Sequence, residues 1–461
     1  MSETRSSIHG EWSSGLIFIL AATGSAVGLG NLWRFPYLVG ENGGAAFVII
    51  YLLCILLVGL PIMIAEITIG RRGKRSPINS LRSVSLEEGR STQWALLGWL
   101  GVAAGFLILS FYSVVGGWAL FYVLQSLLGS FQGITSDSSA HLFETLLASP
   151  WSVLGWHTLF MLILFGIVAM GVRKGLQRAV TILMPLLFVL LILLVGYGMA
   201  ASGAFQEAMA FMFQPDFSVV EGGTILTAMG QAFFTLSLGM GAIMVYGAYL
   251  PKRESIPKSA GWIVGMDTIT AILAGLAIFP IVFAAGLEPG EGPGLVFITL
   301  PIVFGEIPFG YMLGLLFFVL LSVAAITSGM SLLEPATAYL TERRKDGSRV
   351  KAAAIITGLI WVLGIACGLS LNAWSGVTIL PGMGIFDSLE YVSNDIMLPL
   401  GGLLIAIFVG WRMRLSSVIG ELGVNENSPL FKVWLITTRF VAPAAVILVF
   451  ANATGLFGIF G

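Results

Sequence analysis

The stretch Thr23-Gly24-Ser25-Ala26-Val27-Gly28-Leu29-Gly30-Asn31 lies in the middle of the first long apolar segment of the chain. A run so rich in glycine and small hydroxyl side chains makes a poor α-helix. Within a bilayer, an interrupted helix is stable only where it is buried in protein or lines a cavity. Unwinding here would free carbonyl oxygens for a hard cation such as sodium, and would leave a helix amino terminus that favours an anionic group. The alternative is a close helix–helix contact through small residues.

A second interruption of the same kind occurs five apolar segments later. It reads Gly230-Gln231-Ala232-Phe233-Phe234-Thr235-Leu236-Ser237-Leu238-Gly239-Met240-Gly241. Because five is an odd number, two halves that each begin with a broken segment would have opposite orientations in a membrane. Paired interruptions at corresponding positions of two halves point to a transporter site near the bilayer midplane. The pairing therefore favours a functional interpretation of both stretches.

The composition predicts an all-α membrane protein. Of the 461 residues, 57% are hydrophobic and 10% are charged, whereas soluble domains carry about 25% charged residues. Apolar runs long enough to cross a bilayer recur from end to end, without the short alternating segments of a barrel. The net charge of −1 gives no reason to expect a nucleic-acid partner. Cys54 and Cys367 lie in apolar runs and form neither a disulfide framework nor a metal motif.

We expect about eleven spanning segments and a single transmembrane domain without a soluble part. The first inverted repeat would cover about 12–201, the second about 222–411, and an extra helix about 430–458. The first segment lacks a cleavage site and is predicted to be a retained helix. The expected segments are 12–38, 41–69, 94–128, 152–171, 178–201, 222–249, 257–285, 308–341, 350–370, 390–411 and 430–458.

The basic residues predict the orientation of the chain. Of the 23 Lys and Arg, all but Arg34 and Arg439 fall on one side of this segment pattern, Arg5 included, and the opposite loops hold none. Positively charged loops lie on the cytoplasmic side. The amino terminus is therefore predicted to be cytoplasmic, and after eleven segments the carboxyl terminus lies outside.

Three further features carry polar chemistry into apolar segments. Asp267 is an acid flanked by apolar residues, which is typical of a functional site, although it could lie close to a loop. Thr327 and Ser328 offer adjacent hydroxyls, which could instead bond back onto their own helix. Glu390 is expected level with Arg34 on the outer side and is the natural partner of that arginine. These features predict a polar site buried between segments.

Several motifs resemble those of the neurotransmitter:sodium symporters, and most closely their bacterial hydrophobic amino-acid transporters. The resemblance covers nearly the whole chain. Its motifs, in chain order, are Gly24 to Asn31, then Trp33-Arg34-Phe35-Pro36-Tyr37, Glu41-Asn42-Gly43-Gly44, Gly230 to Gly239, and Phe297-Ile298-Thr299-Leu300-Pro301. The resemblance implies a leucine-transporter-like 5+5 inverted-repeat core, with segments 1 and 6 broken, in a bacterial inner membrane.

The resemblance also implies a set of site residues. The first sodium would be held by Ala26, Asn31, Thr235 and Asp267 together with the substrate carboxylate. The second would be held by Gly24, Val27, Ala324, Thr327 and Ser328. The amino-acid substrate would contact Ala26, Leu29, Gly30, Ile108, Tyr112, Phe234, Thr235, Ser237, Met240, Ser328 and Leu332. Arg34 and Glu390 would form the outer gate above a lid of Phe234 on Tyr112, and Tyr249 and Glu342 would serve the inner gate.

Departures from the family pattern sharpen the expected function. Gly28 stands where amine carriers have an aspartate, which favours substrates that bring their own carboxylate. Met240 stands where the leucine carrier has phenylalanine, and flexible methionine suits large or varied side chains, including tryptophan. Asp267 stands where many members have asparagine, and Ala271 replaces a serine that helps to bind chloride. The fixed carboxylate predicts chloride independence with two sodium ions as the only inorganic cofactors.

Two features near the cytoplasmic side complete the expectation. His9 stands where the family's inner-gate arginine usually lies, so a latch to Glu342 would weaken at higher pH as the imidazole loses its charge; a disordered terminus with Arg5 standing in is the alternative. Gly175 and Pro185 bracket nine residues that relatives with this spacing can unwind, although proline can also be only a kink.

The sequence thus predicts a secondary active symporter that couples sodium entry to the uptake of hydrophobic amino acids by alternating access. An intramembrane enzyme is disfavoured because His9, His141 and His157 lie at or near segment ends, away from Ser237 and Ser328. A channel or a non-transporting amino-acid sensor on the same fold would have similar binding residues, and the sequence barely separates these alternatives from a symporter.

Overall fold

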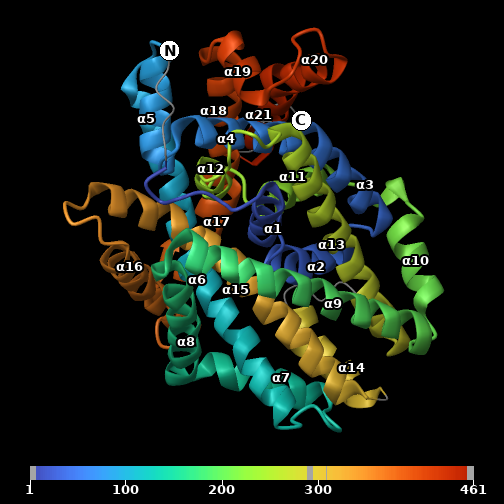
Figure 1. Cartoon of the computed structure of the whole chain (residues 1–461). Helices are drawn as coiled ribbons and strands as arrows, with labels where there is room; N and C mark the ends of the chain where they lie inside the picture. Colours follow the sequence, from blue (N-terminus) through green and yellow to red (C-terminus); the bar gives the residue numbers. More distant parts are fainter. Residues whose placement is uncertain (1–6, 288–293, 308, 454–461) are drawn as a thin grey trace.

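The computed structural model describes residues 7–287, 294–307 and 309–453, and these residues are mostly helical (Figure 1). Within them, nine helices are long and apolar enough to cross a membrane, and one further pair of helices passes the same test together but is bent by 49°. The predicted class, an all-α membrane protein, is confirmed. Arg5, residue 308 and the predicted end of the last segment (454–458) lie outside the described residues.

The first predicted segment is the bent pair. Its first helix, α1 (Gly15–Ala26), is followed by an irregular turn and then by the π-helical turn η1 (Gly30–Arg34) and α2 (Phe35–Glu41). A Cβ atom added at Gly28 would lie 2.7 Å from the Cβ of Ser328 and 2.9 Å from the hydroxyl of Tyr112. Only glycine allows α1 to approach its neighbours so closely at the break.

The sixth predicted segment is also broken, as the sequence suggests. Helix α11 (Gly222–Thr235) and helix α12 (Ala242–Ala248) are separated by residues 236–241. Ser237 (φ 53°), Gly239 (φ 79°) and Gly241 (φ 76°) all have left-handed backbone conformations in this stretch. Glycine adopts these conformations at little cost, whereas a serine is strained there. Each half is too short to span a bilayer alone, so the expected count of eleven segments stays a prediction.

The other membrane-spanning helices follow the predicted segments to within a few residues, except at the start of the fifth and tenth. The fifth begins with a π-helical turn, η4 (Val172–Gln177), and the tenth begins at Ile385. In order, they are α3 (Ala45–Cys54), η2 (Ile55–Gly59) and α4 (Leu60–Gly73); η3 (Thr92–Trp94) and α6 (Ala95–Leu127); α8 (Pro150–Ala169); η4 and α9 (Arg178–Ala201); α13 (Ile256–Ala284); α15 (Gly310–Arg343); α16 (Arg349–Leu369); α17 (Ile385–Tyr391), η7 (Val392–Met397), α18 (Leu398–Ile407) and η8 (Phe408–Arg412); and α20 (Pro429–Ile436), η9 (Thr437–Val441) and α21 (Ala442–Ala453).

Short elements connect these helices at the two ends of the molecule. Helices α5 and α19 lie at one end and α7 and α14 at the opposite end (Figure 1). The loop that contains α5 is rich in Lys and Arg, and Arg412 and Arg414 precede α19, whereas the loops that contain α7 and α14 have neither Lys nor Arg. The connecting elements are α5 (Pro77–Glu87), α7 (Ser136–Ala148), α10 (Phe205–Phe213), η5 (Phe217–Val219), η6 (Leu295–Thr299), α14 (Leu300–Glu306), α19 (Leu415–Leu422) and an antiparallel hairpin of β1 (Thr378–Leu380) and β2 (Met383–Gly384).

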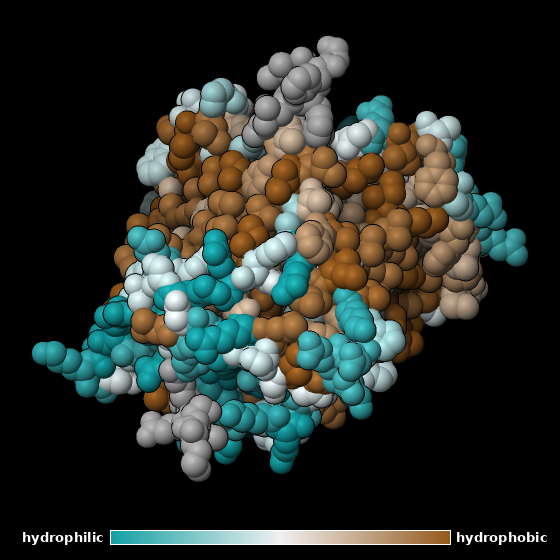
Figure 2. Space-filling view, turned by 90° about the horizontal axis from the view of Figure 1, so that it is seen from above, coloured by the Kyte–Doolittle hydropathy of each residue, from teal (hydrophilic) through white to brown (hydrophobic). Residues whose placement is uncertain are grey.

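The two broken segments lie in the centre of the bundle. Helix α15 packs along α6, and α1 packs against both α13 and α15. Residues 23–31 are all buried as a result. Apolar side chains cover a broad continuous area of the outer surface, while polar side chains gather toward one side of the same view (Figure 2). The fold therefore buries its polar interruptions and presents apolar side chains to its surroundings, as a bilayer requires.

Candidate ion and substrate site

Three polar side chains from three different helices meet at the break in the first segment. The Thr235 hydroxyl donates to Asp267 Oδ1 (3.0 Å) and lies 3.1 Å from Asn31 Oδ1, and the Asn31 amide donates to Asp267 Oδ1 (2.9 Å). All three residues are fully buried. A buried carboxylate with an amide oxygen and a hydroxyl is the type of oxygen set that a hard cation binds. The predicted first sodium residues are thus brought together.

The break leaves main-chain carbonyl groups next to this cluster without helical partners. The amides of Gly28 and Asn31 do not donate to the carbonyls of Gly24 and Val27, which would be their partners in a continuous helix, but to Asn31 Oδ1 (3.4 Å) and to the Gly28 carbonyl (3.2 Å). Unpaired buried carbonyls are costly unless something else binds them. The resemblance places Gly24 and Val27 at the second sodium site, and their carbonyl groups are free of these helical bonds.

The second predicted ion site lies where α1 faces α15. A Cβ atom added at Gly24 would be 3.3 Å from the Cβ of Thr327, so the two backbones are in close contact there. The Thr327 hydroxyl donates to the carbonyl of Ala324 (3.0 Å) on its own helix. The hydrogen bond from this hydroxyl to its own helix, which was the alternative interpretation of the sequence, is therefore present. Because the hydroxyl uses its hydrogen in this bond, its oxygen lone pairs stay available for a further interaction.

A small cavity adjoins the ion cluster between the broken segments, α6 and α15. Nine of the predicted substrate residues line it, together with Gly28. The lining residues are Ala26, Gly28, Gly30, Ile108, Tyr112, Phe234, Ser237, Met240, Ser328 and Leu332. Two predicted substrate residues are placed differently: Leu29 reaches the cavity only through its amide group, and Thr235 faces the ion cluster.

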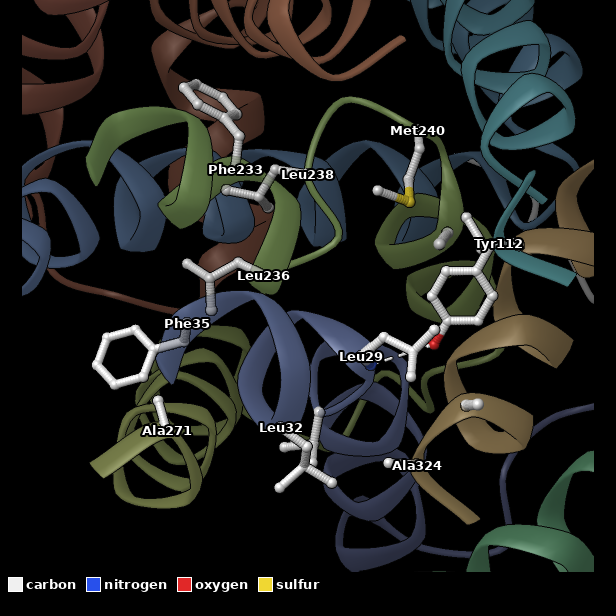
Figure 3. Packing of buried hydrophobic residues seen from close by; sticks show 14 of the residues in the cluster. Leu29, Leu32, Phe35, Tyr112, Phe233, Leu236, Leu238, Met240, Ala271 and Ala324 are labelled. Atoms are coloured by element: carbon white, nitrogen blue, oxygen red, sulfur yellow. Dashed lines mark hydrogen bonds between the residues drawn. The ribbon is translucent and has the colours of Figure 1, made fainter. Parts of the chain in front are cut away.

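The cavity has one polar and one apolar side. At the polar side the Leu29 amide donates to the Tyr112 hydroxyl (3.3 Å), and the hydroxyls of Tyr112 and Ser328 would each lie 2.9 Å from a Cβ atom added at Gly28. Met240 lies across from Tyr112, and Figure 3 shows both side chains with the Leu29–Tyr112 hydrogen bond. Among the residues that the structure describes, no Asp, Glu, Lys, Arg or His lines the cavity. A ligand there must bring its own charged group to the polar side and an apolar group to the other.

Arg34 closes the outer side of the cavity. Its guanidinium lies 5.1 Å from the centre of the Phe234 ring, within cation–π distance. Glu390 and Asp395 both act on it electrostatically, but no ion pair joins Arg34 to Glu390 among the described residues. The predicted outer-gate residues are therefore neighbours in an arrangement in which their salt bridge is not formed.

The inner side is held by several hydrogen-bonded pairs. His9 Nε2 lies 3.0 Å from Glu342 Oε1, and the same carboxylate accepts the Ser76 amide (2.7 Å). The Trp12 indole donates to the carbonyl of Tyr246 (3.1 Å). The His9–Glu342 contact that the sequence predicted is present, and it links the amino-terminal segment to the end of α15.

The scan against family models matches the sodium:neurotransmitter symporter family over residues 9–138 and 149–457. The chain belongs to this family. A sodium-dependent transporter of Bacillus subtilis, YhdH, is 40% identical over 449 residues, which cover 97% of this chain and 98% of that protein. One from Haemophilus influenzae is 36% identical over 96% of this chain and 97% of that protein. The crystal structure of MhsT in complex with L-phenylalanine superposes with a TM-score of 0.89 at 47% identity, covering 96% of this chain and 99% of MhsT.

The chain is therefore a multi-pass, sodium-dependent symporter and not an enzyme. The family match and the TM-score agree with the expected membership and with the leucine-transporter-like architecture. The site combines residues of both broken segments, which lie about 200 positions apart in the chain.

Two buried acids of the symporter, Glu66 and Glu334, were not among the residues predicted from the sequence. Glu334 accepts the Tyr249 hydroxyl (2.6 Å) and pairs with Arg349, so Tyr249 is bonded to Glu334 while Glu342, the other acid at the inner side, contacts His9. Glu66 accepts the amide of Gly239 (2.6 Å) and so supports the loop between α11 and α12. Both are fully buried acids within apolar segments. The rule that singled out Asp267 would have found them.

A chain of hydroxyl groups also joins the broken segments to α15. The Ser237 hydroxyl donates to the carbonyl of Ser25 (2.9 Å), Ser25 donates to Ser331 (2.7 Å), and Ser331 donates to the carbonyl of Ser328 (2.7 Å). Each small hydroxyl satisfies a polar group that the broken helices expose. The sequence gave no signal for this pairing, because serine is common in membrane helices and its partners are distant in the chain.

Proposed function

We propose that this symporter couples the inward movement of sodium to the uptake of hydrophobic L-amino acids, both aliphatic and aromatic, by alternating access. The observation that carries the proposal is the cavity with the Tyr112 hydroxyl and Leu29 amide at one side and Met240 across from them, next to the Asp267 cluster. A zwitterion fits there with its carboxylate toward the ion cluster and its side chain toward the apolar wall. The phenylalanine bound to the similar MhsT supports this substrate class.

Shared coordination would couple the ion to the substrate. The substrate carboxylate would complete the shell of the first sodium beside Asn31, Thr235 and Asp267, so neither would bind well alone. A second ion would bind among the free carbonyls of Gly24 and Val27 and the face of α15 that carries Ala324, Thr327 and Ser328. Two ions crossing 100 mV supply roughly 4–5 kcal/mol, about a thousandfold accumulation before any sodium gradient is added.

The buried carboxylate of Asp267 would replace chloride. Chloride supplies a negative charge near the first sodium in members that need it, and here Ala271 leaves no hydroxyl for it one helical turn away. Asp267 provides a fixed charge in contact with Asn31 and Thr235. We therefore expect uptake to be independent of chloride.

The orientation and the repeats belong to the same proposal. The end of the molecule with α5 and α19 would be cytoplasmic, the amino terminus with it, and the carboxyl terminus would lie outside a bacterial inner membrane. The halves 12–201 and 222–411 would be related by inversion about the site, with 430–458 added. Support comes from the separation of loops with Lys and Arg from loops without them, at opposite ends of the molecule (Figure 1).

Uptake of labelled tryptophan and leucine into proteoliposomes tests the proposal. A sodium gradient should drive accumulation above the level in the medium, and potassium in place of sodium should abolish it. A channel cannot accumulate a neutral solute, and a sensor moves none. Sodium-dependent binding without accumulation would therefore overturn the transport assignment in favour of a sensor.

Replacing Tyr112 with phenylalanine should weaken substrate binding. The variant keeps the ring but removes the hydroxyl that meets the Leu29 amide at the polar side of the cavity. In the proposed complex this hydroxyl donates to the substrate carboxylate. Losing a hydrogen bond to a charged group costs about 1.5–3 kcal/mol, so the half-saturating substrate concentration should rise by roughly tenfold or more. Concentration-dependent uptake measures it. Tyr122→Phe, which removes a buried hydroxyl bonded to the Phe297 carbonyl, is the matched control and should leave the affinity unchanged.

Replacing Met240 with phenylalanine should change the choice of substrate. The larger, stiffer ring would shorten the apolar side of the cavity opposite Tyr112, so indole side chains would clash before isobutyl ones do. Competition by tryptophan against labelled leucine should fall by roughly tenfold. Met244→Phe, at a buried methionine one turn into α12 and outside the cavity lining, serves as the control; an equal fall in that variant would contradict the assigned role of Met240.

A further inference from the structure

A basic groove lies at the start of α9, away from the transport cavity. It is open to the surface and is formed by the end of α8, the π-helical turn η4 and the first two turns of α9. Three of its residues are cationic and two are apolar. The lining residues are Met170, Arg173, Lys174, Gln177, Arg178, Thr181 and Ile182.

The cations of this groove lack acidic partners. Several other basic residues at this end of the molecule are paired with acids, for example Arg71 with Glu421 and Arg344 with Asp346. In the part of the chain that the structure describes, no carboxylate pairs with Arg173, Lys174 or Arg178, and Arg173 reaches only the carbonyl oxygen of Glu11 (3.3 Å). All three side chains are exposed.

The three cations of this groove lie close together at a position where their positive charges destabilise the protein unless an anion is bound. Three like charges within six residues repel one another. They also lie in the first turns of a long helix, where the macrodipole disfavours cations. An anion in the groove would relieve both effects, so the groove is complementary in charge to an anionic ligand.

The apolar residues restrict the kind of anion. Met170 is 57% exposed and Ile182 is 59% exposed, and both line the same groove as the cations. The rest of α8 and α9 is apolar and faces outward with exposed side chains such as Leu162 and Leu186. A ligand that uses the whole groove therefore carries an anionic head and an apolar tail.

We propose that this groove binds the headgroup of an anionic phospholipid, with the phosphate among Arg173, Lys174 and Arg178 and the start of an acyl chain along Met170 and Ile182. Basic pockets between membrane helices on the side that faces the cytoplasm bind lipids of this kind, and each cation near the surface contributes about fivefold in affinity. The inference concerns binding alone and stands whether or not the proposed amino-acid substrate is correct.

A bound lipid would also restrain the segment that carries it. Gly175 lies within this turn, where an added Cβ would collide with the carbonyl of Ile167, so η4 depends on a tight contact with α8. The Gln177 side chain donates to the Ser13 hydroxyl (2.9 Å) and ties η4 to the amino-terminal segment. Amide hydrogen exchange in residues 172–181 should therefore slow when anionic lipid is present.

The test compares lipid retention by the full-length protein in native mass spectrometry. Phosphatidylglycerol should be retained in preference to phosphatidylcholine, and the double variant Lys174→Gln/Arg178→Gln should lower the apparent affinity for phosphatidylglycerol by roughly tenfold or more. Arg82→Gln/Lys432→Gln removes the same charge from exposed positions outside the groove and should retain the lipid as the unmodified protein does.

Three results would overturn the proposal: equal retention of both lipids, equal loss in the control variant, or complete displacement of phosphatidylglycerol by soluble glycerol phosphate, which would indicate a phosphate site without lipid. Lys174→Glu gives a second variant at a single exposed position. It should also reduce retention, so a folding defect in the double variant would not leave the result open.

Discussion

Replacing Asp267 with asparagine is expected to raise the half-saturating sodium concentration for uptake by roughly tenfold or more, and to bring uptake near background at ordinary sodium concentrations. The substitution keeps the size of the side chain and its capacity to bond with Asn31 and Thr235. It removes the only formal charge in the cluster, and the affinity of an oxygen site for a cation depends strongly on the number of charged ligands. Uptake measured against sodium concentration reports the change directly.

Thermal unfolding provides a second readout of the same change that needs no transport. Sodium that binds only the folded protein raises its melting temperature, so the sodium-dependent shift should largely disappear in Asp267→Asn. Asp346→Asn, at an acid exposed near the surface and paired with Arg344 and Lys351, is the control and should keep the full shift. An unchanged sodium dependence in Asp267→Asn would remove this residue from the ion site.

The chloride dependence of uptake tests whether the Asp267 carboxylate replaces a bound chloride ion. The unmodified protein should take up substrate equally well when gluconate replaces chloride. The double variant Asp267→Asn/Ala271→Ser should regain part of its uptake only in chloride, because the anion could then supply the missing negative charge. If uptake by the unmodified protein falls to background without chloride, the proposed role of the Asp267 charge is wrong.

Replacing Glu334 with glutamine is expected to destabilise the protein by about 3 kcal/mol or more. Glu334 is fully buried between the Arg349 guanidinium and the Tyr249 hydroxyl. Without its charge, Arg349 stays in a low-dielectric setting with no counter-ion, and breaking a buried pair from one side costs about 3–5 kcal/mol. Thermal unfolding in detergent should show a clear drop in melting temperature.

A double-mutant cycle separates the pair from a general packing defect. Arg349→Met removes the other charge while it keeps most of the volume, so Glu334→Gln/Arg349→Met should be more stable than Glu334→Gln alone. The exposed pair of Arg344 and Asp346 is the matched control, and Asp346→Asn should change stability by less than about 1 kcal/mol. Additive losses in the cycle would show that the two buried residues do not act as a pair.

The same loss should also affect the transport cycle. Tyr249 lies next to the residues that hold the inner side, where the Trp12 main-chain amide donates to the Tyr249 carbonyl (3.0 Å). Loss of the Glu334 charge weakens its hydrogen bond with the Tyr249 hydroxyl, and with it the connection between α12, α15 and the amino-terminal segment. Labelling of a cysteine introduced at Ser13 should be faster in Glu334→Gln than in the unmodified background.

The membrane class and the two broken segments were determined by the sequence alone. Apolar runs of bilayer length are stable as transmembrane helices. The glycine-rich stretches 24–30 and 239–241 lack the side chains that would stabilise a continuous helix. The acid at Asp267 could be singled out because charge in such a segment is costly and needs a reason. The resemblance to a family then supplied which helices face one another.

The tertiary structure decided the partners of buried polar groups. Glu334 meets Tyr249 and Arg349, and Glu66 meets the Gly239 amide, through contacts between helices that no local spacing encodes. The basic groove at η4 is likewise a property of the folded end of α8 and α9, since a charge run in the sequence does not reveal whether acids lie beside it. Local patterns fix where a helix breaks or enters the bilayer, because these depend on neighbouring residues; which polar atoms satisfy one another depends on packing between segments that are far apart in the chain.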